Sequence, residues 1–136
     1  NLPANMAALD GSGEVPPLNQ VLKLADLVIT NGAHRTVCES IAHAKPLIVL
    51  PLAFEHFDNG QRVHETGVGA RIDAYKFTDD QLLDTMRRFL LPEDEKGTAA
   101  RAKLRTASER IQSSSAHDTL VGKIEDMLTA KKAKQS

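Results

Sequence analysis

Two short apolar runs, residues 27–30 and 47–50, constrain the fold of this chain more than any other feature. Neither run alternates with polar residues, and each is too short for a helix, which is typical of parallel strands buried on both faces. Residues 36–44 between them carry apolar and small side chains at helical spacing. A strand, a tight loop, a helix and a second strand within about thirty residues form a right-handed βαβ unit. The sequence therefore predicts an α/β, Rossmann-like, doubly wound parallel sheet.

The predicted sheet needs further strands. An amphipathic stretch at residues 59–66 leads into an expected edge strand at residues 70–72, and residues 6–9 are another candidate strand. Because a parallel sheet is covered on both faces, three or four strands are few for one domain. We therefore expect the first βα units of a larger fold to be missing. Residues 1–116 would form the partial Rossmann-like domain, and residues 117–136 its C-terminal helix with a frayed basic tail.

The second half of the chain is predicted to be helical. Thr78 and Gln81 have the spacing of a capping box, and apolar residues then recur at helical spacing until Pro92 ends the helix. Residues 97–115 are weakly apolar, so we expect a surface helix there. A last helix, at about residues 118–130, has one apolar face.

Composition narrows the classes of function. Hydrophobic residues make up 41% of the chain and charged residues 26%, and the net charge is -1. Such a balanced chain lacks the strong positive field that draws proteins to nucleic acid. With only 4% aromatic residues, it also lacks a stacking platform for single strands. No nucleic-acid partner is expected.

The single cysteine and the histidines argue against disulfides and metals. Cys38 is alone, and its place in a predicted helix favours a packed thiol. The five histidines show no i, i+4 pair and no cysteine partner at zinc spacing, so no metal site is expected. The longest apolar run, residues 46–54, falls far short of the roughly 20 residues that span a bilayer. The first residues lack the features of a signal peptide, so we expect a cytoplasmic protein without direct membrane insertion.

The turn at residues 30–36 is the candidate site. Ligands of open α/β sheets bind beyond the carboxyl ends of the strands, where a helix N-terminus offers free N–H groups and the positive end of its dipole. Thr36 adds a hydroxyl, Arg35 adds donors suited to phosphate, and Glu39 has acceptors for ribose hydroxyls. The alternative is that the turn merely reverses the chain and Arg35 is solvated. The local residues leave both open.

Motifs across residues 15–72 follow one another in a distinctive order. They are Val15-Pro16, Val21-Leu22, Ala25-Asp26 and the strand that follows, Asn31-Gly32-Ala33, Thr36, Glu39, Ala44-Lys45-Pro46, the strand ending in Pro51, Glu55-His56 and Asn59. In order and spacing they resemble the donor-binding C-terminal domain of UDP-sugar glycosyltransferases with the GT-B fold, of the UDP-glucuronosyl- and glucosyltransferase type. The resemblance implies that residues 1–116 are part of a nucleotide-sugar-binding domain.

The resemblance implies a role for each matching residue. The implied contacts are to the donor diphosphate from Asn31, Gly32, Ala33, Arg35 and Thr36, to the ribose from Glu39, to the sugar from Glu55 and His56, and to the base from Val15 and Pro17. It implies no catalytic residue in this span, because the family's general base lies in its N-terminal domain. It implies no metal, and no cofactor besides the UDP-sugar substrate.

Four positions depart from the family pattern. Asn31 stands where the family has a histidine, and Ala33 where it has a second glycine. His56 replaces the sugar-binding glutamine, and Glu14 replaces an aromatic ring that packs on uracil. Arg35 is an additional cation beside the turn.

The implied function is binding of a nucleotide-diphosphate sugar for transfer of a hexosyl group to an acceptor hydroxyl. The acceptor, a small molecule or a lipid, would be held by a missing N-terminal domain or a partner chain, so the chain alone should transfer little. Two alternatives remain. The chain is a separate donor-binding subunit that pairs with a membrane-anchored partner, or it is a degenerate, non-catalytic interaction module with the same fold.

Overall fold

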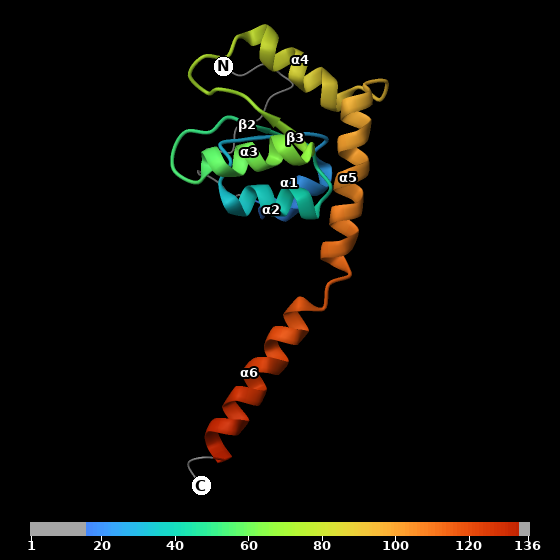
Figure 1. The fold of residues 1–136 in the computed structure, drawn as a ribbon. Helices are drawn as coiled ribbons and strands as arrows, with labels where there is room; N and C mark the ends of the chain where they lie inside the picture. The colour runs from blue at the N-terminus through green and yellow to red at the C-terminus, as the bar shows by residue number, and fades with distance from the viewer. Residues whose placement is uncertain (1–15, 134–136) are drawn as a thin grey trace.

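The computed structural model describes residues 16–133, and within them strands and helices alternate through the first half of the chain (Figure 1). The elements are, in order, α1 (Leu18–Leu24), β1 (Val28–Thr30), α2 (His34–Ala42), β2 (Leu47–Val49), α3 (His56–Thr66), β3 (Gly69–Arg71), α4 (Asp79–Leu90), α5 (Glu95–Gln112) and α6 (Ala116–Ala133). The predicted βαβ unit is confirmed. The candidate strand at residues 6–9 lies outside the described residues.

The three strands form one parallel sheet in the order β1-β2-β3. Ile48 of the central strand pairs with Ile29 on one side and Ala70 on the other, and β2 is completely buried. The expectation that the first run is buried on both faces is wrong, because Ile29 is 47% exposed. The reason is that β1 lies at an edge of the described sheet, where it has only one neighbouring strand.

The central strand divides the core into two clusters. Leu47 and Val49 point to one face of the sheet, and Ile48 points to the other. The first cluster adds Val37 of α2, Val63 of α3 and Leu104 of α5, and the second adds Ala70 of β3, Phe89 of α4 and Ala100 of α5. Helices therefore cover both faces of the sheet, as the doubly wound prediction requires.

Helix α4 begins and ends where the sequence predicts. The Thr78 hydroxyl oxygen accepts a hydrogen bond from the Gln81 amide at 3.2 Å, and the helix ends at Leu90, two residues before Pro92. The capping interaction satisfies one of the backbone donors left free in the first turn.

The surface helix predicted at residues 97–115 is confirmed as α5, which also has a buried side that its weakly apolar pattern did not indicate. Gly97, Ala100, Leu104 and Ser108 lie along that side, and the helix packs against α2 and α4. The Ser108 hydroxyl donates a hydrogen bond of 2.6 Å to the Ala42 carbonyl at the end of α2. Most of these side chains are small, so close approach of backbones, and not a row of large apolar side chains, holds α5 in place.

The last helix, α6, projects away from the body of the molecule (Figure 1). Its large apolar side chains are each at least 40% exposed, namely Leu120, Val121, Ile124, Met127 and Leu128.

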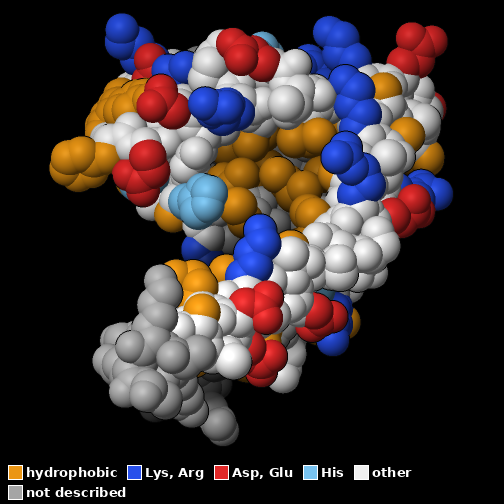
Figure 2. All heavy atoms as spheres, turned by 60° about the horizontal axis from the view of Figure 1, so that its bottom comes forward, with side chains coloured by type: hydrophobic (Ala, Val, Ile, Leu, Met, Phe, Trp, Pro, Cys, Tyr) orange, Lys and Arg blue, Asp and Glu red, His pale blue; other side chains and the backbone are white. Residues whose placement is uncertain are grey.

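Seen from below, the body of the molecule has a hollow with a hydrophobic floor and with Lys and Arg side chains along one rim (Figure 2). No helix in the described part of the chain is both long and apolar enough to cross a membrane. The division of the chain at residue 116 stays a prediction.

Candidate functional site

The turn after β1 and the start of α3 meet at the carboxyl edge of the sheet. Gly32 in the turn has a φ of +93°, and a Cβ there would lie 2.7 Å from Val49 Cγ1 and 3.1 Å from the His56 carbonyl oxygen. The chain from the end of β2 therefore returns directly against the turn. Parallel strands bring this about, because their carboxyl ends lie at the same edge of the sheet. Two groups of predicted site residues, separated in the sequence, are thus neighbours in the structure.

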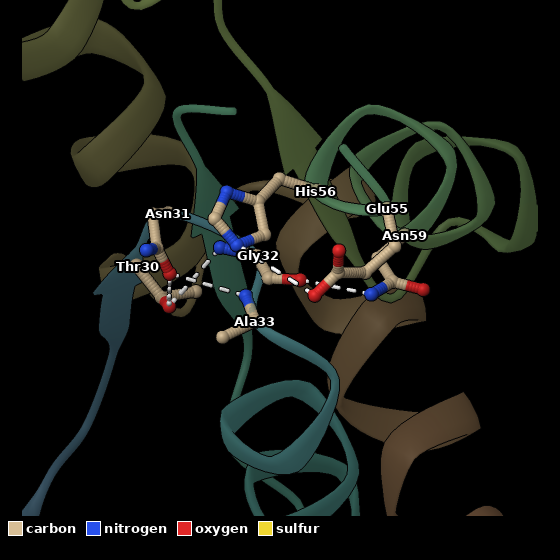
Figure 3. A network of polar contacts seen from close by, with 7 residues as sticks. All are labelled: Thr30, Asn31, Gly32, Ala33, Glu55, His56 and Asn59. Atoms are coloured by element: carbon tan, nitrogen blue, oxygen red, sulfur yellow. Dashed lines mark hydrogen bonds and ion pairs between the residues drawn. The ribbon is translucent and has the colours of Figure 1, made fainter. Parts of the chain in front are cut away.

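A network of side-chain hydrogen bonds fixes the turn (Figure 3). The Asn59 Nδ2 group of α3 donates to the Gly32 carbonyl at 2.9 Å. On the other side, Thr30 Oγ1 accepts from the Gly32 amide at 3.2 Å, and Asn31 Oδ1 accepts from the Ala33 amide at 3.1 Å. The N–H groups of Gly32 and Ala33 therefore already have partners within the turn and are not free to bind a ligand.

Within residues 16–133, the next amides of the chain, at the start of α2, have no side-chain cap. Ala33 is the N-cap of α2 and supplies no side-chain cap, and the first turn of the helix carries no acidic residue. The first backbone N–H groups of a helix lack acceptors within the helix. With the positive end of the helix dipole, these groups favour an anion beside His34, Arg35 and Thr36.

Arg35 and Glu39, the predicted phosphate and ribose ligands, bind each other. Arg35 Nε lies 2.7 Å from Glu39 Oε1, one helical turn apart, and the two side chains are 81% and 27% exposed. The hydrogen bond and the negative charge of Glu39 raise the pKa of Arg35 above its usual value. Arg35 is therefore protonated wherever the protein is folded near neutral pH.

Two buried polar atoms of the site lack partners. In the part of the chain that the structure describes, Glu39 Oε2 and His56 Nδ1 are the side-chain nitrogen and oxygen atoms that are buried without a hydrogen bond. His56 is mostly buried, and its other ring nitrogen lies 3.8 Å from Oε1 of the exposed Glu55. Buried polar atoms are nearly always hydrogen-bonded in folded proteins, and exceptions call for a ligand, a water or a functional reason. Both atoms belong to residues predicted to contact the donor.

The predicted contacts to the base fall at the beginning of the described residues or before it. Pro17 is the exposed N-cap of α1, while Val15 and Glu14 lie outside the described residues, so the base-flanking roles of Val15 and Pro17 stay predictions. Among the residues described, no group of three or more His, Cys, Asp or Glu side chains has the arrangement of a metal site.

Two residues in or near the site differ from the sequence prediction or were missed by it. The packed thiol predicted for Cys38 is wrong, because Cys38 is exposed, with its Sγ 3.5 Å from His34 Nε2. It faces outward because its neighbour Val37 takes the buried side of α2.

Nothing in the sequence indicated the unusual backbone at Phe54, just before Glu55. Phe54 has a φ of +49°, and its side chain is 88% exposed. A positive φ at a bulky residue is rare and marks a strained backbone.

A separate cavity of about 250 Å³ lies away from the turn. Its lining includes Gly69 at the amino end of β3, together with Arg88, Lys96 and Lys103. Because the strands are parallel, this end of β3 is opposite the edge that carries the turn. Lys103 Nζ is already engaged there, donating to the Thr66 carbonyl at 2.9 Å. The cavity is therefore not part of the candidate site.

Asn59→Ala should loosen the turn. It leaves the partly buried Gly32 carbonyl without its donor, so we expect the free energy of unfolding to fall by about 1 kcal/mol. Amide resonances of residues 32–34 should shift in the same variant. The control is Gln61→Ala on the same helix, which removes only exposed hydrogen bonds and should cost less. Equal losses in the two variants, with unchanged turn resonances, would contradict the role of Asn59.

Sequence relatives of this chain are sugar transferases. A UDP-glucuronosyltransferase of Pleuronectes platessa is 35% identical over 66 residues, which cover 48% of this chain and 14% of that protein. A zeaxanthin glucosyltransferase of Pantoea ananas is 39% identical over 70 residues, which cover 52% of this chain and 16% of that protein. The matches thus span about one seventh of the length of these relatives.

Solved structures with the same fold are also glycosyltransferases. The spinosyn forosaminyltransferase SpnP matches 95% of this chain and 32% of its own, with a TM-score of 0.79 and 22% identity. A UDP-glucose: anthocyanidin 3-O-glucosyltransferase in complex with UDP matches 74% of this chain and 23% of its own, with a TM-score of 0.66 and 19% identity. At these identities the likeness shows the fold, which is that of GT-B glycosyltransferases.

The family model of the glycosyltransferase family 28 C-terminal domain matches residues 15–133, which is nearly the whole chain. The match includes the turn, the residues around the start of α3, and the helices that follow the sheet. By this match, and with a fold of three parallel strands between helices, the chain belongs to the glycosyltransferase family 28 C-terminal domain family and has the GT-B type of architecture.

Proposed function

We propose that this chain binds a nucleotide-diphosphate sugar, in particular a UDP-sugar, as the donor for transfer of a hexosyl group to an acceptor hydroxyl. The observation that carries the proposal is the pair of buried, unpartnered atoms Glu39 Oε2 and His56 Nδ1 in residues of the candidate site. A polar ligand with several hydroxyl groups would supply the missing hydrogen bonds. One protein with the same fold is in complex with UDP, which agrees with this choice of ligand.

The diphosphate would lie at the N-terminus of α2. The uncapped amides of the first helical turn, the Thr36 hydroxyl and the Arg35 guanidinium are the donors available to it. Asn31 would take part through Nδ2, because its Oδ1 accepts the Ala33 amide. Gly32 would contribute by letting the backbone approach the ligand closely, since its own amide is bonded to Thr30.

The sugar and the ribose would use the two unpartnered atoms. Glu39 would accept two ribose hydroxyls through its two carboxylate oxygens, of which Oε2 is unpartnered and Oε1 is bonded to Arg35. His56 with Glu55 would hold the sugar hydroxyls from the start of α3. During transfer the bond between the anomeric carbon and the diphosphate oxygen breaks, and a bond to the acceptor oxygen forms. Negative charge then develops on the leaving diphosphate, where the start of α2 and Arg35 would stabilise it.

The acceptor and the general base would come from outside this chain. The relatives are several times longer than their matched segments, so there is room in such proteins for an acceptor-binding part. The proposal also allows a partner chain to supply these groups. The isolated chain should bind donor and transfer little.

A second candidate, a non-catalytic module that has lost donor binding, is favoured by one observation. Asn31 Oδ1 occupies the Ala33 amide, as an anion would. If this contact closes the site, the double variant Asn31→His, Ala33→Gly should bind UDP measurably more tightly than the natural chain does.

The test is a titration of the ¹⁵N-labelled chain with UDP, UDP-glucose, UDP-N-acetylglucosamine and dTDP. We expect saturable amide shifts at Thr36, Glu39 and His56, and none at Gly122 of the distant α6. Thr36→Val should weaken binding, because it replaces the hydroxyl with a methyl group, whereas Thr106→Val on the exposed side of α5 should not. The absence of shifts up to millimolar ligand in the natural chain would contradict the proposal, and binding only by the double variant would identify the non-catalytic module.

A further inference from the structure

The ion pair between Arg35 and Glu39 places two proposed donor ligands in contact with each other. Only Nε of Arg35 is engaged, at 2.7 Å from Glu39 Oε1. Its two terminal nitrogens have no hydrogen-bond partner within residues 16–133, and the side chain is 81% exposed. Glu39 is the less exposed member, and its second oxygen is buried. Arg35 is thus the solvent-exposed member of the pair, and Glu39 is the more enclosed one.

The pair is easily separated by a better partner for Arg35. An exposed ion pair contributes little net free energy, because water and salt screen it and two side chains lose freedom. A guanidinium binds a phosphate group through two parallel hydrogen bonds, which are stronger and more specific. The start of α2, directly beside Arg35 in the chain, is where such an anion is favoured. An anion there would therefore compete successfully for Arg35.

We propose that Arg35 makes donor recognition depend on the diphosphate: Arg35 pairs with Glu39 Oε1, and a bound diphosphate draws Arg35 away and releases this oxygen for the ribose. This inference rests on the proposed function, because it takes Glu39 as the ribose acceptor and the start of α2 as the phosphate position. Its consequence is selectivity. A nucleoside must displace Arg35 from Glu39 without offering it another anion, whereas a nucleoside diphosphate supplies the anion itself.

The test compares uridine, UDP and inorganic pyrophosphate on the natural chain and on Arg35→Gln. Glutamine keeps a polar side chain but removes the charge and the guanidinium fork. We expect Arg35→Gln to weaken UDP binding by about 10-fold or more, the usual effect of losing a hydrogen bond to a charged group. Uridine binding should stay the same or become tighter, because Glu39 is now free. The preference for UDP over uridine should therefore collapse.

A matched control is available on α4. Arg87 and Asp84 form another exposed pair, at 3.2 Å, on a helix that packs on the other face of the sheet. Arg87→Gln should leave the affinities for all three ligands unchanged. A direct readout is the Nε–Hε resonance of Arg35, which reports its bond to Glu39 and should shift when pyrophosphate is added to the natural chain.

Each outcome decides the matter. If Arg35→Gln weakens the binding of UDP and of uridine by the same factor, Arg35 only orients Glu39, and the proposed exchange of Arg35 from Glu39 to the diphosphate is wrong. If neither affinity changes, or if pyrophosphate leaves the Nε–Hε resonance in place, Arg35 does not move to the phosphate. Where uridine binds too weakly to measure in both chains, the pyrophosphate shift decides alone. Failure of the exchange with UDP still binding at Thr36 and Glu39 leaves the proposed function standing, whereas loss of all UDP binding by the natural chain overturns both.

Discussion

Gly32→Ala should lower the free energy of unfolding by about 2–4 kcal/mol and remove nucleotide binding at the start of α2. The backbone of Gly32 has a φ of +93°, which side-chain-bearing residues rarely adopt. The new methyl group would also lie 2.7 Å from Val49 Cγ1, in a strand that is completely buried. Strain at the backbone and overpacking each cost about 1–3 kcal/mol. Urea denaturation followed by circular dichroism measures the first effect, and titration with UDP measures the second.

A control for this variant is Gly67→Ala at the end of α3. Gly67 also has a positive φ, of +71°, but a Cβ there meets only the flexible end of the Lys103 side chain. Because the backbone strain is shared and the overpacking is not, Gly67→Ala should cost about 1 kcal/mol and leave UDP binding intact. If the two variants lose equal stability, the close contact between the turn and Val49 contributes nothing to stability, and backbone strain alone explains the loss at Gly32.

The βαβ unit could be predicted because its signals are local. The run at residues 47–50 lies between two prolines and is uniformly apolar, and the structure buries β2 completely. The cap at Thr78 and the stop before Pro92 depend only on neighbouring residues, and both are confirmed. Elements of this kind depend on the spacing of apolar residues and on the backbone preferences of a few neighbouring residues, and both can be read from a single sequence.

The contacts that build the site could not be predicted in the same way. The bond from Asn59 to Gly32 joins residues that are 27 positions apart, and it exists only because β1 and β2 end at the same edge of the sheet. Arg35 and Glu39 do carry a local signal, since opposite charges at i, i+4 on a helix attract each other. The interpretation of both residues as ligands did not use that signal, and the structure shows the ion pair that it indicates.

The packing of α5 was missed because the hydropathy pattern gives little weight to small residues. Gly97, Ala100, Leu104 and Ser108 fall on one side of the helix at spacings of three and four residues, yet only leucine among them is strongly hydrophobic. A row of small residues allows two backbones to approach closely, and the structure uses it so that α5 contributes to both core clusters. Helix spacing without large apolar side chains is therefore a signal of close helix packing in this chain.

Gly97→Ala should be the second large loss of stability, because the backbones of α5 and of the end of α4 lie close together at this residue. A Cβ on Gly97 would collide with the carbonyl oxygen of Arg88 and lie 3.3 Å from the Cα of Phe89. Both neighbours are backbone atoms that cannot rotate away, so the two helices must separate. Phe89 is 5% exposed and belongs to the core cluster that also contains Ala100. We expect a loss of about 2–4 kcal/mol, from overpacking together with weakened burial of Phe89.

Gly122→Ala in α6 is the matched control for this helix glycine. A Cβ on Gly122 meets no atom within 4 Å, so the substitution adds only helix propensity and should leave stability unchanged or raise it by up to about 1 kcal/mol. The measurement is the urea midpoint of each variant at an unchanged slope, which separates a change in stability from a change in the denatured state. If Gly97→Ala unfolds at the same urea concentration as Gly122→Ala, then α4 and α5 do not meet through their backbones. The small residues of α5 would then need another explanation.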